Sequence, residues 1–210
     1  MLNIKKILKK LSETRPVFHS EADFQYALAG EIQRHHPKAQ IRLEINLPVF
    51  DKKEYIDIRV KIGSKVYIIE LKYKTKKINL EYNEEKFYLL NQGAQDVGRY
   101  DFIKDITRLE RFIFKHSNYI GYAIILTNDN LYWRDPVRLN TVDADFRIHE
   151  NIKIKGKLRC DDKASAGTKK GREKDLIIKD SYLMKWSDYS ILKESGPNCF
   201  RSLLLKVKNN

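Results

Sequence analysis

The stretch EYIDIRVKIGSKVYIIELKYK, residues 54–74, decides how this 210-residue chain is expected to fold. Two segments of alternating apolar and polar residues flank Gly63-Ser64. This pattern predicts a β-hairpin with a two-residue type II′ turn. Pairing Ile62 with Lys65 then fixes the register. The facing pairs on one apolar face are Ile58 with Ile69, Val60 with Tyr67, and Ile56 with Leu71.

The polar face of this hairpin places Asp57 directly opposite Glu70, and Tyr55 opposite Lys72. Like charges in directly opposed positions are destabilising, and a divalent cation between Asp57 and Glu70 would remove the repulsion. Hard cations such as Mg²⁺ take oxygen ligands and need only one or two carboxylates. Lys72 follows Glu70 by two residues and therefore points to the same face. The alternative is a surface ion cluster, worth little, in which Lys72 bridges Glu70 and Asp57.

Asp57, a hairpin, and then Glu70-Leu71-Lys72 resemble the motif of the PD-(D/E)xK nuclease superfamily, whose members have the restriction-endonuclease-like fold. Ile56 stands where the name of the family has a proline, and the resemblance covers roughly residues 18–127. It implies an endonuclease that hydrolyses DNA phosphodiester bonds with Mg²⁺, for which Mn²⁺ can substitute. A type II restriction-like enzyme is one form of this activity. Asp57, Glu70 and the carbonyl of Leu71 would bind the metal, and Lys72 would orient the attacking water or offset charge on the pentavalent phosphate.

A helix is expected to begin after Ser20, with Phe24, Leu28 and Ile32 on its buried face, and to end near residues 35–37. Glu21 falls in its first turn. The nuclease resemblance implies that Glu21 reaches the metal site, directly or through water. The alternative is that Glu21 only complements the helix dipole.

A second long helix is expected over residues 91–115, with a core stripe formed by Phe102, Ile106, Leu109 and Ile113. Extending this stripe backward puts Gln95 near its centre, and Gln92 and Arg99 toward its edge. The resemblance implies a site glutamine on this helix, either Gln95 or Gln92. The alternative is that these turns extend into solvent. The charged residues of the helix are expected to form a solvated surface: Asp101, Lys104, Asp105, Arg108, Glu110 and Arg111.

The remaining elements predict an α/β chain with a mixed sheet. Residues 40–49 form the first strand, residues 78–90 a mobile or loosely helical connection, and residues 119–127, YIGYAIILT, a strand buried on both faces. The order helix, three strands, helix, strand is that of the αβββαβ nuclease core. We assign residues 1–139 to this core, with an N-terminal amphipathic helix. Its face of Ile4, Ile7, Leu8 and Leu11 is expected to pack on the domain or on a partner subunit, and the alternative is a membrane or DNA surface. Residues 140–210 form a β-rich extension of the same domain, with an exposed loop at residues 160–175.

The net charge of +13, from 41 basic and 28 acidic residues, predicts an anionic partner, either nucleic acid or a membrane surface. The alternative is a soluble protein that is merely basic. We take the partner to be double-stranded DNA. Phosphate contacts carry no sequence information, so base contacts are expected from residues 140–210. An enzyme that reads a palindrome is expected to be a homodimer. A catalytically inactive, nucleic-acid-binding protein on a nuclease fold is the alternative function. The candidate backbone contacts, which are otherwise solvated surface positions, are Lys74, Lys76, Lys77, Arg99, Lys169, Lys170 and Arg172.

The sequence also argues against several classes of protein. Its two cysteines, Cys160 and Cys199, give neither a disulfide framework nor a zinc spacing, so a reducing, cytoplasmic location is expected. No apolar run approaches the roughly 20 residues that a membrane span needs, and no membrane partner is expected. No phosphate-binding loop or zinc-protease helix motif occurs.

Overall fold

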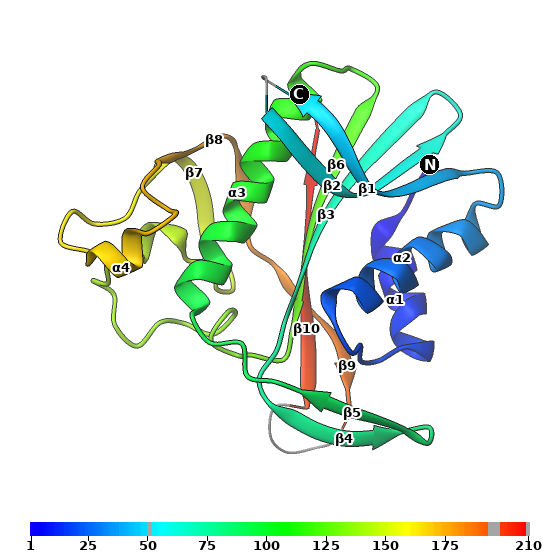
Figure 1. Cartoon of the computed structure of the whole chain (residues 1–210), viewed down its shortest axis with the longest axis horizontal. Helices are drawn as coiled ribbons and strands as arrows, with labels where there is room; N and C mark the ends of the chain where they lie inside the picture. The colour runs from blue at the N-terminus through cyan, green and yellow to red at the C-terminus, as the bar shows by residue number, and fades with distance from the viewer. Residues whose placement is uncertain (50–51, 193–197, 209–210) are drawn as a thin grey trace.

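A six-stranded mixed sheet with the order β1-β2-β3-β6-β10-β9 runs through the molecule (Figure 1). The computed structural model describes residues 1–49, 52–192 and 198–208. The main sheet is built from β1 (Gln40–Val49), β2 (Lys52–Ile62), β3 (Lys65–Lys74), β6 (Tyr119–Thr127), β9 (Trp186–Ile191) and β10 (Cys199–Val207). The three long helices are α1 (Ile4–Thr14), α2 (Glu21–His35) and α3 (Gln95–Phe114). The fold is therefore mixed α and β, as predicted.

The predicted hairpin register is confirmed near its turn. β2 and β3 pair from Ile62↔Lys65 to Ile58↔Ile69, and Gly63 has a φ of +59°, which glycine adopts without strain. β3 then pairs with β6 in parallel, with Glu70 beside Ala123 and Lys74 beside Thr127. β3 is therefore an inner strand of the sheet, and its side chains lie between the two helical layers.

The predicted pairing of Ile56 with Leu71 is wrong, because β2 reverses its faces at Asp57. Ile58 packs in the core beneath α1 and α2, whereas Ile56 packs in the core beneath α3. The pairs Leu43↔Ile58 and Ile45↔Ile56 flank this point in β1, where Glu44 has a φ of +49°. The ladder between β2 and β3 ends at Ile58↔Ile69, so Asp57 and Glu70 are not a directly opposed pair.

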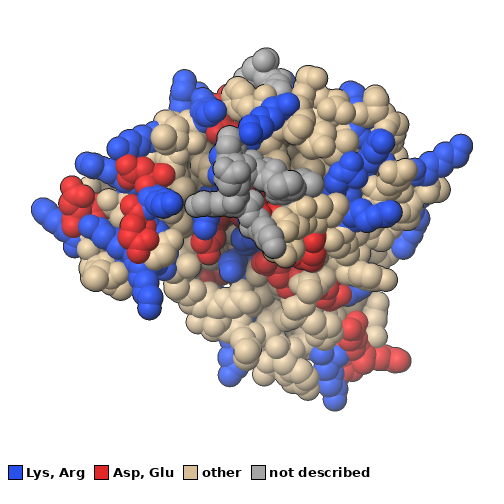
Figure 2. All heavy atoms as spheres, turned by 45° about the horizontal axis from the view of Figure 1, so that its top comes forward, with Lys and Arg blue, Asp and Glu red and all other residues tan. Residues whose placement is uncertain are grey.

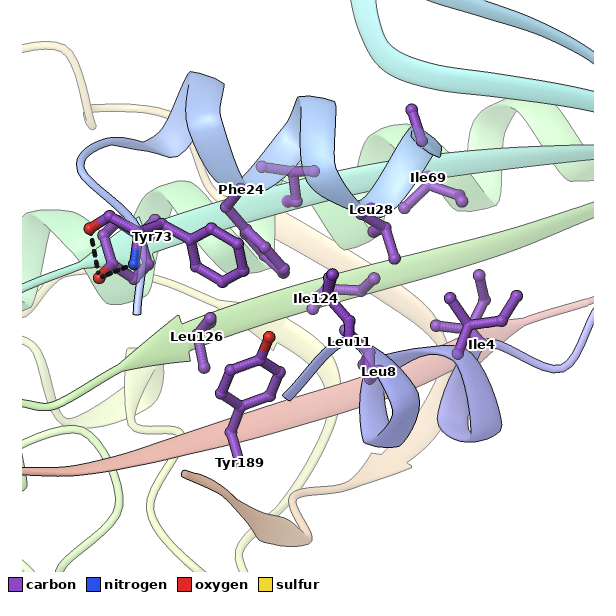
Figure 3. Packing of buried hydrophobic residues seen from close by; sticks show 14 of the residues in the cluster. Ile4, Leu8, Leu11, Phe24, Leu28, Ile69, Tyr73, Ile124, Leu126 and Tyr189 are labelled. Carbon is purple, nitrogen blue, oxygen red and sulfur yellow. Dashed lines mark hydrogen bonds between the residues drawn. The ribbon is translucent and has the colours of Figure 1, made fainter. Parts of the chain in front are cut away.

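One face of the sheet is covered by α1 and α2 (Figures 1 and 3). Ile4, Leu8 and Leu11 of α1 are buried here, as predicted. Ser20 caps α2 by accepting a hydrogen bond from the Asp23 N–H. Phe24 and Leu28 of α2 pack over Ile69 and Tyr73 of β3, as Figure 3 shows. The Tyr73 hydroxyl donates to the carbonyl of Phe18 over 2.9 Å, which ties β3 to the chain that leads into α2.

The opposite face is covered by α3, whose Phe102, Ile106, Leu109 and Ile113 are buried as predicted. The helix begins at Gln95 rather than at Asn91, after Ala94 in a left-handed conformation. The prediction of a mobile or loosely helical connection before α3 is wrong. Residues 78–90 instead contain a hairpin of β4 (Ile78–Tyr82) and β5 (Glu85–Leu89), whose turn residues Asn83 and Glu84 both have positive φ.

Residues 140–208 are rich in strands, as expected, but their last two strands complete the main sheet. β10 pairs antiparallel with β6, and β9 pairs with β10. A separate two-stranded sheet joins β7 (Lys153–Leu158) to β8 (Leu176–Leu183) beside α3. The exposed loop expected at residues 160–175 contains one short helix, α4 (Ala166–Lys169), and a 3-10 turn, η1, covers Ala144–Phe146. No helix in the described part of the chain is long and apolar enough to cross a membrane.

Candidate active site

Two charged residues interrupt the apolar inner strand β3 on the side that faces α3. Glu70 is 1% exposed. Arg108 of α3 donates from Nε to Glu70 Oε1 over 2.9 Å. Lys72 Nζ lies 2.8 Å from Oδ2 of Asp105, which is also on α3. Arg108 contacts Asp105 Oδ1 at 3.1 Å, because residues three apart lie on the same helix face. Two acids and two bases therefore form one ion-pair network between strand and helix.

Asp57 and Glu21 satisfy backbone groups of β3 that β2 no longer reaches. The Leu71 N–H donates to Asp57 Oδ2 over 2.7 Å, and the Tyr73 N–H donates to Glu21 Oε2 over 2.8 Å. Gln25 of α2 fixes the reversed part of β2 from the other side. Its amide donates to the Asp57 carbonyl and to Glu44 Oε1, both over 2.7 Å. The point where β2 leaves β3 is thus lined by carboxylates.

Five predicted site residues meet at this point: Asp57, Glu70, Leu71, Lys72 and Glu21. The Leu71 carbonyl accepts a hydrogen bond from Lys72 Nζ over 3.3 Å, so it faces the same cluster. Lys72 does not bridge Asp57 and Glu70 as the surface-cluster alternative predicts, because its ion pair is with Asp105.

Gln95 and Gln92 lie outside this cluster. Gln95 donates to Asp129 Oδ2 over 2.7 Å, at the loop that follows β6. It precedes Asp105 by ten residues, which is about 15 Å along the helix axis. Gln92 lies before α3, where its N–H donates to the Thr75 carbonyl. The prediction of a glutamine at the site is therefore wrong, because the part of α3 that faces β3 lies farther along the helix.

Asp105 and Arg108 take the place predicted for a glutamine. Both were expected on a solvated surface, and this is wrong: Asp105 is 6% exposed, and Glu110 is buried as well. Asp105 is three residues after Phe102 and four before Leu109, so it lies on the buried stripe itself. That spacing, with Arg108 three residues later, was the signal in the sequence.

Burial and mutual repulsion shift the acids of this cluster. Burial raises the pKa of Asp57 to about 6. The Leu71 N–H and Lys72 oppose this rise because they favour the ionised form, whereas the charges of Asp105 and Glu21 add to it. Burial, followed by the charge of Asp105, also raises the pKa of Glu70 well above its usual value, although Arg108 opposes the shift. Burial by itself would lower the pKa of Lys72, but Asp105 outweighs it and the pKa is raised. Lys72 therefore remains positively charged.

The charges of the cluster leave room for a divalent cation. With every group ionised, four carboxylates (Glu21, Asp57, Glu70, Asp105) face two cations (Lys72, Arg108), which gives a net charge of −2. Glu70 Oε2 and Asp105 Oδ2 are buried and accept no hydrogen bond from the described residues; each has only an ion-pair contact. Oxygen donors of this kind suit Mg²⁺ or Mn²⁺.

The acids are not arranged as a ready metal cage. No group of three or more His, Cys, Asp or Glu side chains among the described residues is placed to hold an ion. Arg108 and Lys72 lie against Glu70 and Asp105 instead. Magnesium requires few protein carboxylates, so the donor set formed by Asp57, Glu70 and the Leu71 carbonyl fits it, provided that Arg108 moves away from Glu70.

The expected nucleic-acid contacts are scattered over the molecule. Lys74, Lys76 and Lys77 end or follow β3, and Lys76 Nζ lies 3.4 Å from Asp129. Arg99 is paired with Asp143, so it is not the free surface cation expected. Lys169, Lys170 and Arg172 lie on or beside α4. On the face drawn in Figure 2, Lys and Arg side chains spread over several elements rather than forming one patch.

Comparisons with protein-family models, with curated proteins and with solved structures give no match to this chain.

Proposed function

We propose that this chain is a Mg²⁺-dependent endonuclease on a restriction-endonuclease-like core. The observation that carries the proposal is the meeting of Asp57, Glu70, the Leu71 carbonyl and Lys72 where β2 leaves β3. The order α2-β1-β2-β3-α3-β6, with the parallel pairing of β3 and β6, supports the αβββαβ core. The hairpin β4–β5 is an insertion between β3 and α3.

Each residue of the cluster has a defined task in phosphodiester hydrolysis. Asp57, Glu70 and the Leu71 carbonyl would hold the metal, with Glu21 behind them. The chemistry that such an ion would supply is polarisation of the scissile phosphate and a lower pKa for a water molecule next to it. Lys72 keeps its positive charge beside the Leu71 carbonyl and stabilises the negative charge that develops on the phosphate. Asp105 positions the ammonium group of Lys72.

The net charge of +13 favours DNA as the substrate, because a polyanion is attracted by such an excess of basic residues. Lys74, Lys76 and Lys77 continue directly from the strand that carries Lys72, so they are placed to contact phosphates next to the scissile one. A homodimer in the cytoplasm that reads a palindrome remains part of this proposal.

The pairing of Arg108 with Glu70 favours a second candidate function, a nucleic-acid-binding protein without catalysis. Arg108 already satisfies Glu70 Oε1, and a site that never exchanges this cation for a metal cannot cleave. Calorimetric titration with Mn²⁺ separates the two functions. If the chain is a nuclease, it binds Mn²⁺, and Glu70→Gln weakens that binding. If it is a binding protein without catalysis, it binds DNA but not Mn²⁺.

Cleavage is tested on a library of duplex DNA of random sequence, because a specific enzyme needs its own site. The whole chain is incubated with Mg²⁺, and ends are mapped by sequencing. We expect cleavage by the wild type and its loss, by at least a hundredfold, in Asp57→Asn and Lys72→Gln. Lys65→Gln, at the exposed turn end of the same strand, is the matched control and should cleave normally. Equal cleavage by the wild type, Asp57→Asn and Lys72→Gln would place the activity elsewhere.

A further inference from the structure

A second site lies beside the first turns of α3, where the loop after β6 folds back on the helix. It is a cavity of about 240 Å³. Four arginines are among its lining residues, whereas only two carboxylates, Asp135 and Asp143, are present. The charge of these six groups is therefore +2. Its arginines are Arg99, Arg134, Arg138 and Arg147.

Two of these arginines hold the wall of the cavity. Arg99 pairs with Asp143 and donates to the Leu131 carbonyl over 3.4 Å. Arg147 donates to Thr141 Oγ1 over 3.0 Å. Although burial opposes its ionisation, the hydroxyl of Thr141 and the guanidinium of Arg99 lower the pKa of Asp143. The loop is thus tied to α3 by charges that persist at neutral pH.

The other two arginines are available to a ligand. Arg134 and Arg138 are exposed, and no carboxylate of the described residues forms an ion pair with either side chain. Guanidinium groups bind phosphate oxygens through two parallel hydrogen bonds. A pair of such groups at one cavity, with neither forming an ion pair with the two acids that line it, is suited to an anion.

Two buried donors inside the wall also lack an acceptor. Arg99 Nε and the Tyr132 hydroxyl are buried and form no hydrogen bond with the described residues. Tyr132 is 1% exposed, and burial raises its pKa, so it keeps its hydroxyl proton. Both residues line the cavity, but these two atoms are enclosed by protein, so the contacts with a ligand fall to the exposed Arg134 and Arg138.

The rest of the lining suits the remainder of a nucleotide. Leu131, Pro136, Val137 and Ile148 give the cavity an apolar wall. Its volume lies below the range of about 300–1,000 Å³ that drug-sized ligands occupy, so one nucleotide unit fits better than a longer ligand. Gln95, the first residue of α3, also lines it, and helix N-termini favour anions.

We propose that this cavity binds the phosphate of one nucleotide, and that Arg134 and Arg138 donate hydrogen bonds to the phosphate oxygens. The inference rests on the proposed nuclease function for its link to the active site. Arg99 precedes Asp105 by six residues, about 9 Å along α3. The cavity then holds a backbone phosphate of the same DNA, away from the cleaved bond, or the phosphate of a free mononucleotide.

The test uses the whole chain in metal-free buffer, so that cleavage plays no part. Deoxyadenosine 5′-monophosphate and inorganic phosphate are titrated by calorimetry into the wild type, the Arg134→Gln/Arg138→Gln double variant and a matched Lys61→Gln/Lys65→Gln control. The control removes the same charge from an exposed hairpin that is far from the arginines in sequence. We expect the mononucleotide to bind more tightly than phosphate, and its affinity to fall at least tenfold only in the arginine variant.

A duplex arm separates the two sources of phosphate. If the mononucleotide does not bind, but the slope of log K against log salt for a duplex falls by about 2 in the arginine variant alone, the cavity holds a backbone phosphate. If both arms give the same result for the arginine variant and the lysine control, the proposal is overturned. Asp57→Asn should leave the mononucleotide arm unchanged, so loss of cleavage in that variant is independent of this site.

Discussion

Arg108 on α3 reaches across to Glu70 on β3, donating from Nε to Oε1 over 2.9 Å beneath the surface of the protein. The carboxylate is 1% exposed, and Arg108 is the cation in direct contact with it. The position proposed for the metal is therefore occupied by a protein cation. If the proposal holds, loss of Arg108 lowers the stability of the fold and strengthens metal binding.

Arg108→Gln should destabilise the fold by about 3 kcal/mol, because removing one partner leaves a buried charge uncompensated. Urea unfolding at pH 8 measures this loss. The double variant Arg108→Met/Glu70→Met should recover most of it, since both charges are then absent. Lys157→Gln, which breaks the exposed pair with Asp175, is the control and should change stability by less than about 0.5 kcal/mol. A loss in Arg108→Gln no larger than in the control would show that the Glu70 pair contributes nothing.

The same Arg108→Gln variant should bind Mn²⁺ at least tenfold more tightly than the wild type. The cation that competes for Glu70 is gone, while the oxygen donors stay in place. Glu70→Gln should bind at least tenfold more weakly. Isothermal titration calorimetry at pH 8 measures both affinities, and the rise in unfolding temperature with added ion provides an independent check. If Arg108→Gln bound the ion no better than the wild type, Arg108 would not occupy the metal position.

Much of this site follows from local sequence, but its exact geometry does not. The Gly63 turn and the alternation around it predict the pairing of Ile58 with Ile69, because cross-strand register depends on a few neighbouring residues. The alternation of apolar and polar residues gives no sign that β2 reverses its faces at Asp57. It depends on Glu44 in a left-handed conformation and on Gln25, which contacts both strands from a distant helix.

The residues that α3 contributes to the site were not predicted, for a similar reason. Polar residues at the start of α3 favoured Gln95 as a site residue. The sequence does not say which turn of α3 faces β3, because that depends on how the helix packs on the sheet. Asp105 and Arg108 are held there by β3, which is more than thirty residues earlier in the chain. The hairpin β4–β5 was missed because Asn83-Glu84 lacks the glycine that usually marks a tight turn.

Asp57→Asn should stabilise the protein at neutral and basic pH. The pKa of Asp57 is 3.8 in an unfolded chain and about 6 in the fold, so the folded state retains a proton that the unfolded state releases. The contribution of Asp57 is therefore fully present below about pH 4 and declines as pH rises to about 6. The loss amounts to about 3 kcal/mol, and asparagine avoids it while still accepting the Leu71 N–H.

Urea unfolding of Asp57→Asn and the wild type at pH 4, 6 and 8 measures this effect. The difference between the two proteins should grow from near zero at pH 4 to its full value at pH 8. Glu81→Gln, at an exposed position on β4, is the control and should show no such growth. A constant difference across the three pH values would mean that Asp57 does not titrate in this range.

Gly98→Ala and Gly30→Ala should have opposite effects on stability, although both replace a helical glycine. A Cβ at Gly98 would lie 2.1 Å from the Tyr132 hydroxyl, whose ring is enclosed and cannot move aside freely. Such overpacking costs about 1–3 kcal/mol. A Cβ at Gly30 in α2 meets nothing within 4 Å, so alanine there gains about 0.5–1 kcal/mol from helix propensity. Thermal unfolding of both variants measures whether each change raises or lowers the unfolding temperature. Stabilisation by Gly98→Ala would refute the close packing of the loop after β6 on α3.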